Sequence, residues 1–276
     1  MSPCAPVLRV LLVATLPLVA QPVAMVADCQ PRVSFRKGPE VRLLDEITPG
    51  RVLVLERGAR LVLLHMRTGD ELRFVGPGQV SFDPQGNLKG AKPEATRRLP
   101  SLQGAPRVRL QGLIPAATLM RGDLDSTDLE VVPVGPAVLT ERPTFHWRAV
   151  EGVTAYRFKL YDGQGNLRLE REVTEPRLAL GTPDALQEGE RYTWVLEAKA
   201  AGMAPLVGSG RIRLLEKELR VHVERVRPAA NAPFSERLVY AALLDELRLH
   251  DEAQRLWKDM AAERPDSPSL KRLADR

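Results

Sequence analysis

Cysteine and histidine are scarce in this sequence, which limits its capacity for disulfides, metal binding and thiol catalysis. The 276 residues include 2 cysteines, Cys4 and Cys29, and 4 histidines. If the segment that carries Cys4 is removed, no intramolecular disulfide can form and the hydrophobic cores must hold the fold. No two histidines stand at the short spacing that would aim both at one metal ion. The sequence therefore predicts no metal site, no cofactor-binding residues and no catalytic thiol.

Patterns that mark catalytic sites are also missing. There is no G-x-S-x-G motif, and serines are too sparse near the histidines to indicate a triad. The segment 76–78 lacks the lysine and the helix of a phosphate-binding loop. The carboxylate pairs Asp45 with Glu46 and Asp123 with Asp125 lie in turn-like sequence rather than in a pocket that would raise one pKa. We therefore expect a protein that is not an enzyme and has no catalytic residues.

Aromatic residues make up only 5% of the chain, which leaves few rings to stack on sugars or bases. Alternation along the expected strands places Trp147, Trp194 and Tyr156 on inward faces, so a carbohydrate platform would depend on Tyr161. The net charge of +5 is spread over mixed acidic and basic residues. Without a basic stripe interleaved with aromatic residues, no nucleic-acid partner is expected.

The first 27 residues have the pattern of a signal peptide. Arg9 precedes the apolar run VLLVATLPLVA, and small residues follow up to Ala27. Because signal peptidase needs a small residue before the bond it cuts, cleavage is expected after Ala27, with Ala20 as the second choice. The sequence therefore predicts a periplasmic or extracellular protein.

Two other interpretations of this segment concern the membrane. Val10 to Ala27 is an uncharged stretch of 18 residues, the short end of a membrane span, so an uncleaved leader could anchor the chain in the inner membrane. Asp28 stands where a lipoprotein has a small residue before Cys29, which argues against lipidation. Membrane contact is therefore expected only if the leader is not cleaved.

Residues 38–123 show short apolar runs separated by tight, glycine-bearing turns, which is the signal of β-hairpins. The runs are RVLVLE at 51–56, RLVLLHM at 60–66 and ELRFVGPGQVSFD at 71–83. Gly76, Pro77 and Gly78 predict a bulge or sharp bend within the last of them. Residues 84–107, with four prolines among many charges, predict an extended loop, after which RVRLQGLIPAATLMRGD resumes the β pattern.

Residues 128–216 form a second β block. The runs PTFHWRAV, AYRFKLYD, LRLEREV, RYTWVLEAKA and GSGRIRLL are separated by turns such as DGQGN at 162–166. Around seven short strands at nearly regular spacing predict a β-sandwich. Phe158, Leu160, Tyr192, Trp194 and Leu196 are expected on its inward faces.

Helical spacing replaces the β pattern after a proline-bracketed linker at 226–233. Apolar residues recur on one stripe through 234–276: Leu238, Leu243, Leu247, Leu256, Trp257 and Met260. Asp251 with Gln254 resembles a capping box at the start of a second helix, and Ser267 before Pro268 predicts the cap of a third, short one. The tail is therefore expected to be a helical hairpin with a short additional helix.

Three resemblances cover most of the chain. ITPGRVLVLERGARLVLLHMRTGDELRFVGPGQVSF and GLIPAATLMRGD resemble a FecR-like domain, a β module of extracytoplasmic proteins. PTFHWRAVEGVTAYRFKLYDGQGN with ALQEGERYTWVLEA is similar to a fibronectin type III-like domain. In that family Trp147 would be the core tryptophan, and Leu186, Gly189 and Tyr192 would form the tyrosine corner. Residues 234–266 look like one tetratricopeptide repeat, with Ala253, Trp257 and Pro265 at its small, aromatic and proline positions.

Export and these module types together predict a non-catalytic envelope protein that binds a protein partner, in signalling or assembly. Its contacts would be exposed sheet edges or the helical tail, whose apolar stripe could also support self-association. The alternative is a carbohydrate- or peptidoglycan-binding module.

Overall fold

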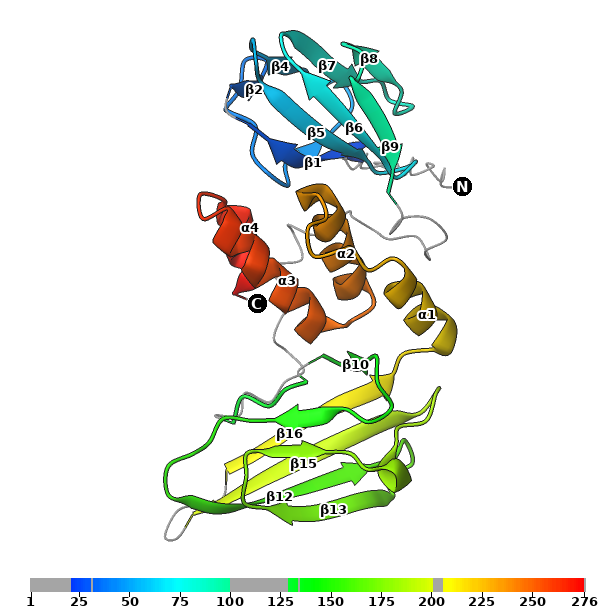
Figure 1. Ribbon diagram of the computed structural model, residues 1–276, viewed down its shortest axis with the longest axis vertical. Coiled ribbons are helices and arrows are strands. Elements are labelled where there is room, and N and C mark those ends of the chain that lie inside the picture. The colour runs from blue at the N-terminus through cyan, green and yellow to red at the C-terminus, as the bar shows by residue number, and fades with distance from the viewer. Residues whose placement is uncertain (1–20, 31, 100–128, 134, 201–205, 276) are drawn as a thin grey trace, which may run out of the picture.

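A computed structural model of the chain describes residues 21–30, 32–99, 129–133, 135–200 and 206–275. It is mainly β, with 38% strand and 21% helix, which confirms the prediction of a β-rich protein with C-terminal helices. The two β modules lie at opposite ends of the molecule, and the helices lie between them (Figure 1). Residues 107–123 and the pair Asp123 and Asp125 fall outside the described residues.

The first β module, residues 23–99, consists of two packed sheets. The order of the first sheet is β3-β1-β5-β6-β9, formed by Glu46–Ile47, Ala24–Cys29, Arg60–His65, Asp70–Val75 and Ala95–Arg98. The order of the second is β2-β4-β7-β8, formed by Val33–Phe35, Leu53–Leu55, Gly78–Phe82 and Leu88–Gly90. The inner faces enclose one core, to which Phe35, Leu53, Leu63, Phe74 and Phe82 belong.

Strand β1 lies inside the segment that the sequence assigned to a leader. It pairs with β3 on one side and with β5 on the other, so it is a central strand of the first sheet. Ala24, Met25, Val26 and Ala27 are all buried. Boundaries at residues 27 and 38 would therefore cut off β1 and β2, and the first module begins at about Val23.

The segment 84–107 is not one extended loop as expected, because β8 and β9 form within it. The bend at 76–78 forms as predicted, between β6 and β7. A Cβ on Gly76 would lie 1.9 Å from the carbonyl oxygen of Glu56. No side chain fits there, so glycine is required at this crossing of two backbone segments.

The second β module, residues 129–215, is also built from two sheets. The order of the larger is β10-β16-β15-β12-β13, formed by Ala137–Val138, Leu206–Leu214, Arg191–Ala200, Val153–Tyr161 and Leu167–Val173. The smaller pairs β11 (Thr144–His146) with β14 (Arg177–Ala179), and a short 3-10 helix spans Thr182–Asp184.

Alternation along these strands gives the expected core. Phe158, Leu160, Tyr192, Trp194 and Leu196 are buried, as predicted, in one cluster. The backbone N–H of Gln187 donates a 3.0 Å hydrogen bond to the Tyr192 hydroxyl, which ties the tyrosine to the loop before its own strand. A Cβ on Gly210 would lie 2.5 Å from the Trp194 ring, so the indole packs directly on the β16 backbone.

Four helices follow in the described chain. They are α1 (Lys217–Arg225), α2 (Phe234–Glu246), α3 (His250–Glu263) and α4 (Pro268–Ala274). None of them is long and apolar enough to cross a membrane. Ser267 caps α4 through its side chain as predicted. The capping box at Asp251 is wrong, because α3 begins one residue earlier at His250, and α1 was not anticipated.

The helices form a layer (residues 217–274, the helical layer) that packs against both β modules. Its core includes Leu238, Leu243, Trp257, Met260 and Leu270. The same cluster contains Met25 and Leu64 from the first sheet and Ala137 and Leu215 from the second module. Of the apolar stripe, Leu238, Leu243, Trp257 and Met260 are therefore buried within the chain.

Candidate functional site

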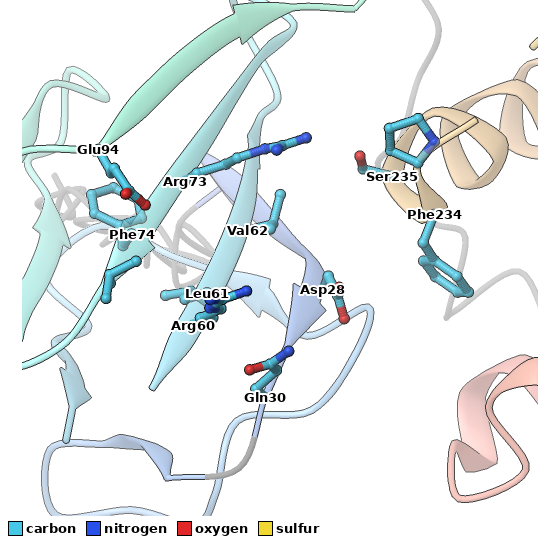
Figure 2. A pocket seen from close by; sticks show the side chains of 12 residues that line it. Asp28, Gln30, Arg60, Leu61, Val62, Arg73, Phe74, Glu94, Phe234 and Ser235 are labelled. Atoms are coloured by element: carbon cyan, nitrogen blue, oxygen red, sulfur yellow. The ribbon is translucent and has the colours of Figure 1, made fainter. Parts of the chain in front are cut away.

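A groove lies on the outer face of the first sheet, beside the first turn of α2 (Figure 2). Its volume is about 410 Å³. Side chains directly opposite each other on paired strands share one face of a sheet. Val62 is opposite both Asp28 and Arg73, and Arg60 is opposite Val75, so these five residues form the floor of the groove.

The helical layer covers only part of this face, and that partial cover creates the groove. Leu64 lies opposite Met25 and Glu71, and these residues belong to the part of the face that the helical layer covers. The neighbouring row is only partly covered, because Val62 packs at the margin of that core, and in the next row Val75 keeps 47% of its surface exposed. Phe234 and Ser235, at the start of α2, form the wall (Figure 2).

Glu71 lies where the covered and open parts of the sheet meet, and it is 0% exposed. Its carboxylate accepts hydrogen bonds from Arg73 at 2.6 Å, from Arg97 at 3.1 Å and from the hydroxyl of Ser235. Arg97 also pairs with Glu236 on α2. The cluster therefore joins β6 and β9 to the first turn of α2, where a helix favours negative charge.

Burial alone would raise the pKa of Glu71, because it penalises the charged form. The hydrogen bonds from Ser235, Arg73 and Arg97 outweigh burial and hold the pKa below its ordinary value. Glu71 is thus an ionised anchor. A general acid would need the opposite shift.

A second charged contact closes the other side of the same interface. Arg264, just after α3, donates a 3.0 Å hydrogen bond to Asp28 on β1. Its guanidinium carbon lies 5.2 Å from the centre of the Phe234 ring. Strand β1, the start of α2 and the end of α3 are therefore fixed together.

The opposite end of the helical layer is fixed to the second β module. The carboxylate of Glu188 accepts a 3.1 Å hydrogen bond from the backbone of Lys217 at the start of α1. Arg220, one turn later, pairs with both Glu141 and Glu188. The proline-bracketed linker 226–233 thus joins two anchored helices.

A backbone contact tightens the same junction. The N–H of Gly135 donates a 3.3 Å hydrogen bond to Asp251 on α3. A Cβ on Gly135 would lie 2.8 Å from the carbonyl oxygen of Arg248 and 3.0 Å from the nitrogen of His250. The second module and the α2–α3 turn are therefore in direct backbone contact.

The structure disperses the four histidines. His65 is a core residue, bonded to Gly86 O at 2.9 Å and accepting from the Thr68 backbone at 3.2 Å. His146 is exposed, between the buried Phe145 and Trp147. His222 is buried on α1, where burial and then Arg225 lower its pKa. His250 begins α3.

The lone thiol and the early carboxylates do not form a reactive cluster. Burial, then Asp28 and Asp45, raise the pKa of Cys29 to about 11, the opposite of an activated thiol. The Asp45 side chain accepts from the Arg42 backbone at 2.8 Å in a turn, as expected. Within the described residues no group of three or more His, Cys, Asp or Glu could hold a metal ion.

All tryptophan, tyrosine and phenylalanine residues lie in the described part of the chain, and only Tyr161 is not buried. Tyr161 itself is half-buried. A carbohydrate platform would therefore depend on this one half-buried ring, as expected from the sequence.

The groove and its charged cluster were not found from the sequence, although a signal was present. In AMVADC at 24–29 and RLVLLH at 60–65 apolar residues occupy both parities of a strand. Such runs indicate a sheet that is covered on both faces. Glu71 lies opposite Leu64, and Arg73 lies opposite Val62, on the neighbouring strand. The register would therefore have placed both charged side chains on the covered face of the sheet.

No protein-family model and no curated protein matches this chain.

Proposed function

We propose that this chain is an exported, non-catalytic scaffold of the bacterial envelope that presents two β modules at a fixed spacing to a protein partner. The observation that carries this proposal is the helical layer, which is bonded to one module through Glu71 and to the other through Glu188. A single helical repeat whose apolar stripe is already covered serves as a spacer rather than as a binding groove.

The module identities belong to the same proposal. The FecR-like assignment, made for residues 38–123, is supported by the run of short, glycine-linked strands that the structure describes up to Arg98. A fibronectin type III-like assignment for the second module is supported by the Tyr192 hydrogen bond and by the burial of Trp147. A tetratricopeptide-like assignment for α2 and α3 is supported by Ala253 and Trp257, which are both buried in the helical core.

We place the partner contact at the groove. Its floor combines apolar Val62 and Val75 with the guanidinium groups of Arg60 and Arg73, and Arg-rich, partly apolar surface is typical of protein interfaces. The exposed sheet edge β13, by contrast, carries charges and a register shift that oppose strand addition.

Two valines of matched exposure test this placement. Val75 lines the groove and is 47% exposed, and Val207, on β16 of the second module, is 51% exposed. A photo-reactive amino acid at position 75, in the full chain expressed in a bacterium, should give one discrete cross-linked envelope protein, identified by mass spectrometry. Position 207 should not.

The reversal Arg60→Glu, at an exposed arginine of the floor, changes the charge of the groove without removing a hydrogen bond to Glu71, and should abolish the adduct at position 75. Equal adducts from both valines, or none at position 75, would contradict a partner site in the groove. Turnover of envelope glycans or peptides by the purified chain, lost on substitution of groove residues, would contradict a non-catalytic role.

A further inference from the structure

Strand β1 restricts where an export leader can be cut. Ala24 and Val26 belong to the core between the two sheets of the first module. Met25 and Ala27, on the other face, belong to the core shared with the helical layer. A chain that begins at Asp28 would lose residues from both cores at once.

The backbone of this segment is also hydrogen-bonded to its neighbours on both sides. The N–H of Val23 donates to Ile47 O at 2.8 Å, and the N–H of Met66 donates to Val23 O at 2.9 Å. The N–H of Val26 donates to Asp45 O at 3.0 Å. Without β1, the edges of β3 and β5 that it joins would lose their pairing.

The strand also shortens the apolar run that a membrane could receive. Of the uncharged stretch 10–27, residues 24–27 are in β1, and Val23 is bonded to β3. The run that remains before Gln21 is residues 10–20, which is 11 residues. This length suits the roughly 7–15 residues of a cleavable leader. It falls short of the roughly 17–25 residues of a span.

We propose that a signal peptidase cuts this chain at the Ala20–Gln21 bond and releases it from the membrane with Gln21 as its first residue. The inference rests on the proposed export. One water is consumed, Ala20 leaves with the new carboxylate and Gln21 keeps the new amino group. Ala20 is a small residue, and Gln21 is exposed and separated from β1 by Pro22 and Val23, so the bond can be cut without opening the sheet.

The test uses the full chain with its own leader, expressed in a bacterium, and measures the intact mass of the periplasmic and membrane fractions. The unchanged chain should be periplasmic with the mass of residues 21–276, or that mass less one ammonia if the terminal glutamine cyclises. Gln21→Pro places a fixed φ and a missing N–H at the cut bond, and should leave the chain uncut, with the mass of residues 1–276. Gln21→Ala, the matched control, should be processed normally.

A periplasmic chain that begins at Asp28, or a Gln21→Pro chain that is still trimmed to Asp28, would overturn the site while leaving export intact. An uncut chain held in the membrane without any substitution would overturn release. A chain retained in the cytoplasm would overturn the proposed export, and this inference with it.

Discussion

Glu71 is a charge in a place where an unpaired charge would be very costly, since an isolated buried carboxylate loses its hydration. Arg73, Arg97 and Ser235 replace that hydration with hydrogen bonds. Ser235 comes from α2, so the third donor is present only when the helical layer is in place. The hydrogen bonding of the Glu71 carboxylate therefore depends on contacts between distant parts of the chain.

Glu71→Gln is expected to lower the free energy of unfolding by about 1.5–3 kcal/mol, the usual value of hydrogen bonds to a charged group. The neutral amide keeps the size of the side chain but loses the charge that attracts two arginines. Denaturant unfolding of the full chain measures the change. Glu94→Gln, at an exposed position beside the groove, should be within about 0.5 kcal/mol of the unchanged protein. Equal effects of the two substitutions would refute the anchor role of Glu71.

Tyr192→Phe should cost about 1–2 kcal/mol, because the Gln187 N–H loses its acceptor while the ring keeps its packing. Tyr161→Phe is the matched control, on the partner strand and half-buried. A circular dichroism melt of each variant would show the difference. A Tyr192 variant that melts together with the control would mean that the hydroxyl contributes nothing.

At the level of single elements, strands with a simple alternation could be predicted from the sequence and strands with two buried faces could not. RYTWVLEAKA alternates, and β15 forms with Tyr192, Trp194 and Leu196 inward. AMVADC does not alternate, because both faces of β1 are covered. The same small and apolar residues are also typical of the end of a signal peptide. A short apolar run cannot by its period distinguish these cases.

Helix boundaries show the same limit. The stripe that contains Leu238 and Trp257 is helical, as its spacing predicts. Helix α1 was missed because KELRVHVER, with Val221 exposed and only His222 and Val223 buried, has too few buried positions to show a period. The position of α1 is determined by contacts with the second module. Glu188 accepts a hydrogen bond from the first residue of α1, and Arg220 on α1 pairs with the same carboxylate. Such contacts cannot be predicted from local pattern.

Gly135 tests the junction between the second module and the α2–α3 turn. Gly135→Ala should lower stability by about 1–3 kcal/mol, because the added methyl meets backbone atoms on the turn that cannot rotate away. Gly163→Ala is the control, since its Cβ would lie at an ordinary 3.4 Å from Arg191 O. Thermal unfolding of both variants, with small-angle scattering of each, would decide. Unchanged melting and scattering for Gly135→Ala would mean that the junction is loose.

For the molecule as a whole, acid should weaken the fold through two groups, whose losses begin at different pH. The pKa of His222 is lowered by burial and by Arg225, so the unfolded chain takes up a proton that the folded chain refuses once the pH falls below about 6.5. The pKa of Glu71 is also lowered, so its contribution is complete above 4.5 and is lost as the pH falls through the lower folded value.

Urea midpoints measured from about pH 8, above the ordinary pKa of histidine, to about pH 3, below that of glutamate, would follow both losses, the upper one from His222 and the lower one from Glu71. His222→Gln should flatten the upper one and Glu71→Gln the lower one. His146→Gln, at an exposed histidine, should change neither. A single fall in stability that all three variants share would show that neither buried group controls the acid response.

The path of the chain has a consequence for its biosynthesis. The first module is made first, yet Glu71 meets Ser235 across 164 residues and Asp28 meets Arg264 across 236. Until residues 217–274 have been synthesised, Met25, Ala27 and Leu64 lack the cover that the helical layer gives them. A nascent or prematurely terminated chain therefore displays an apolar sheet face that chaperones and proteases can recognise.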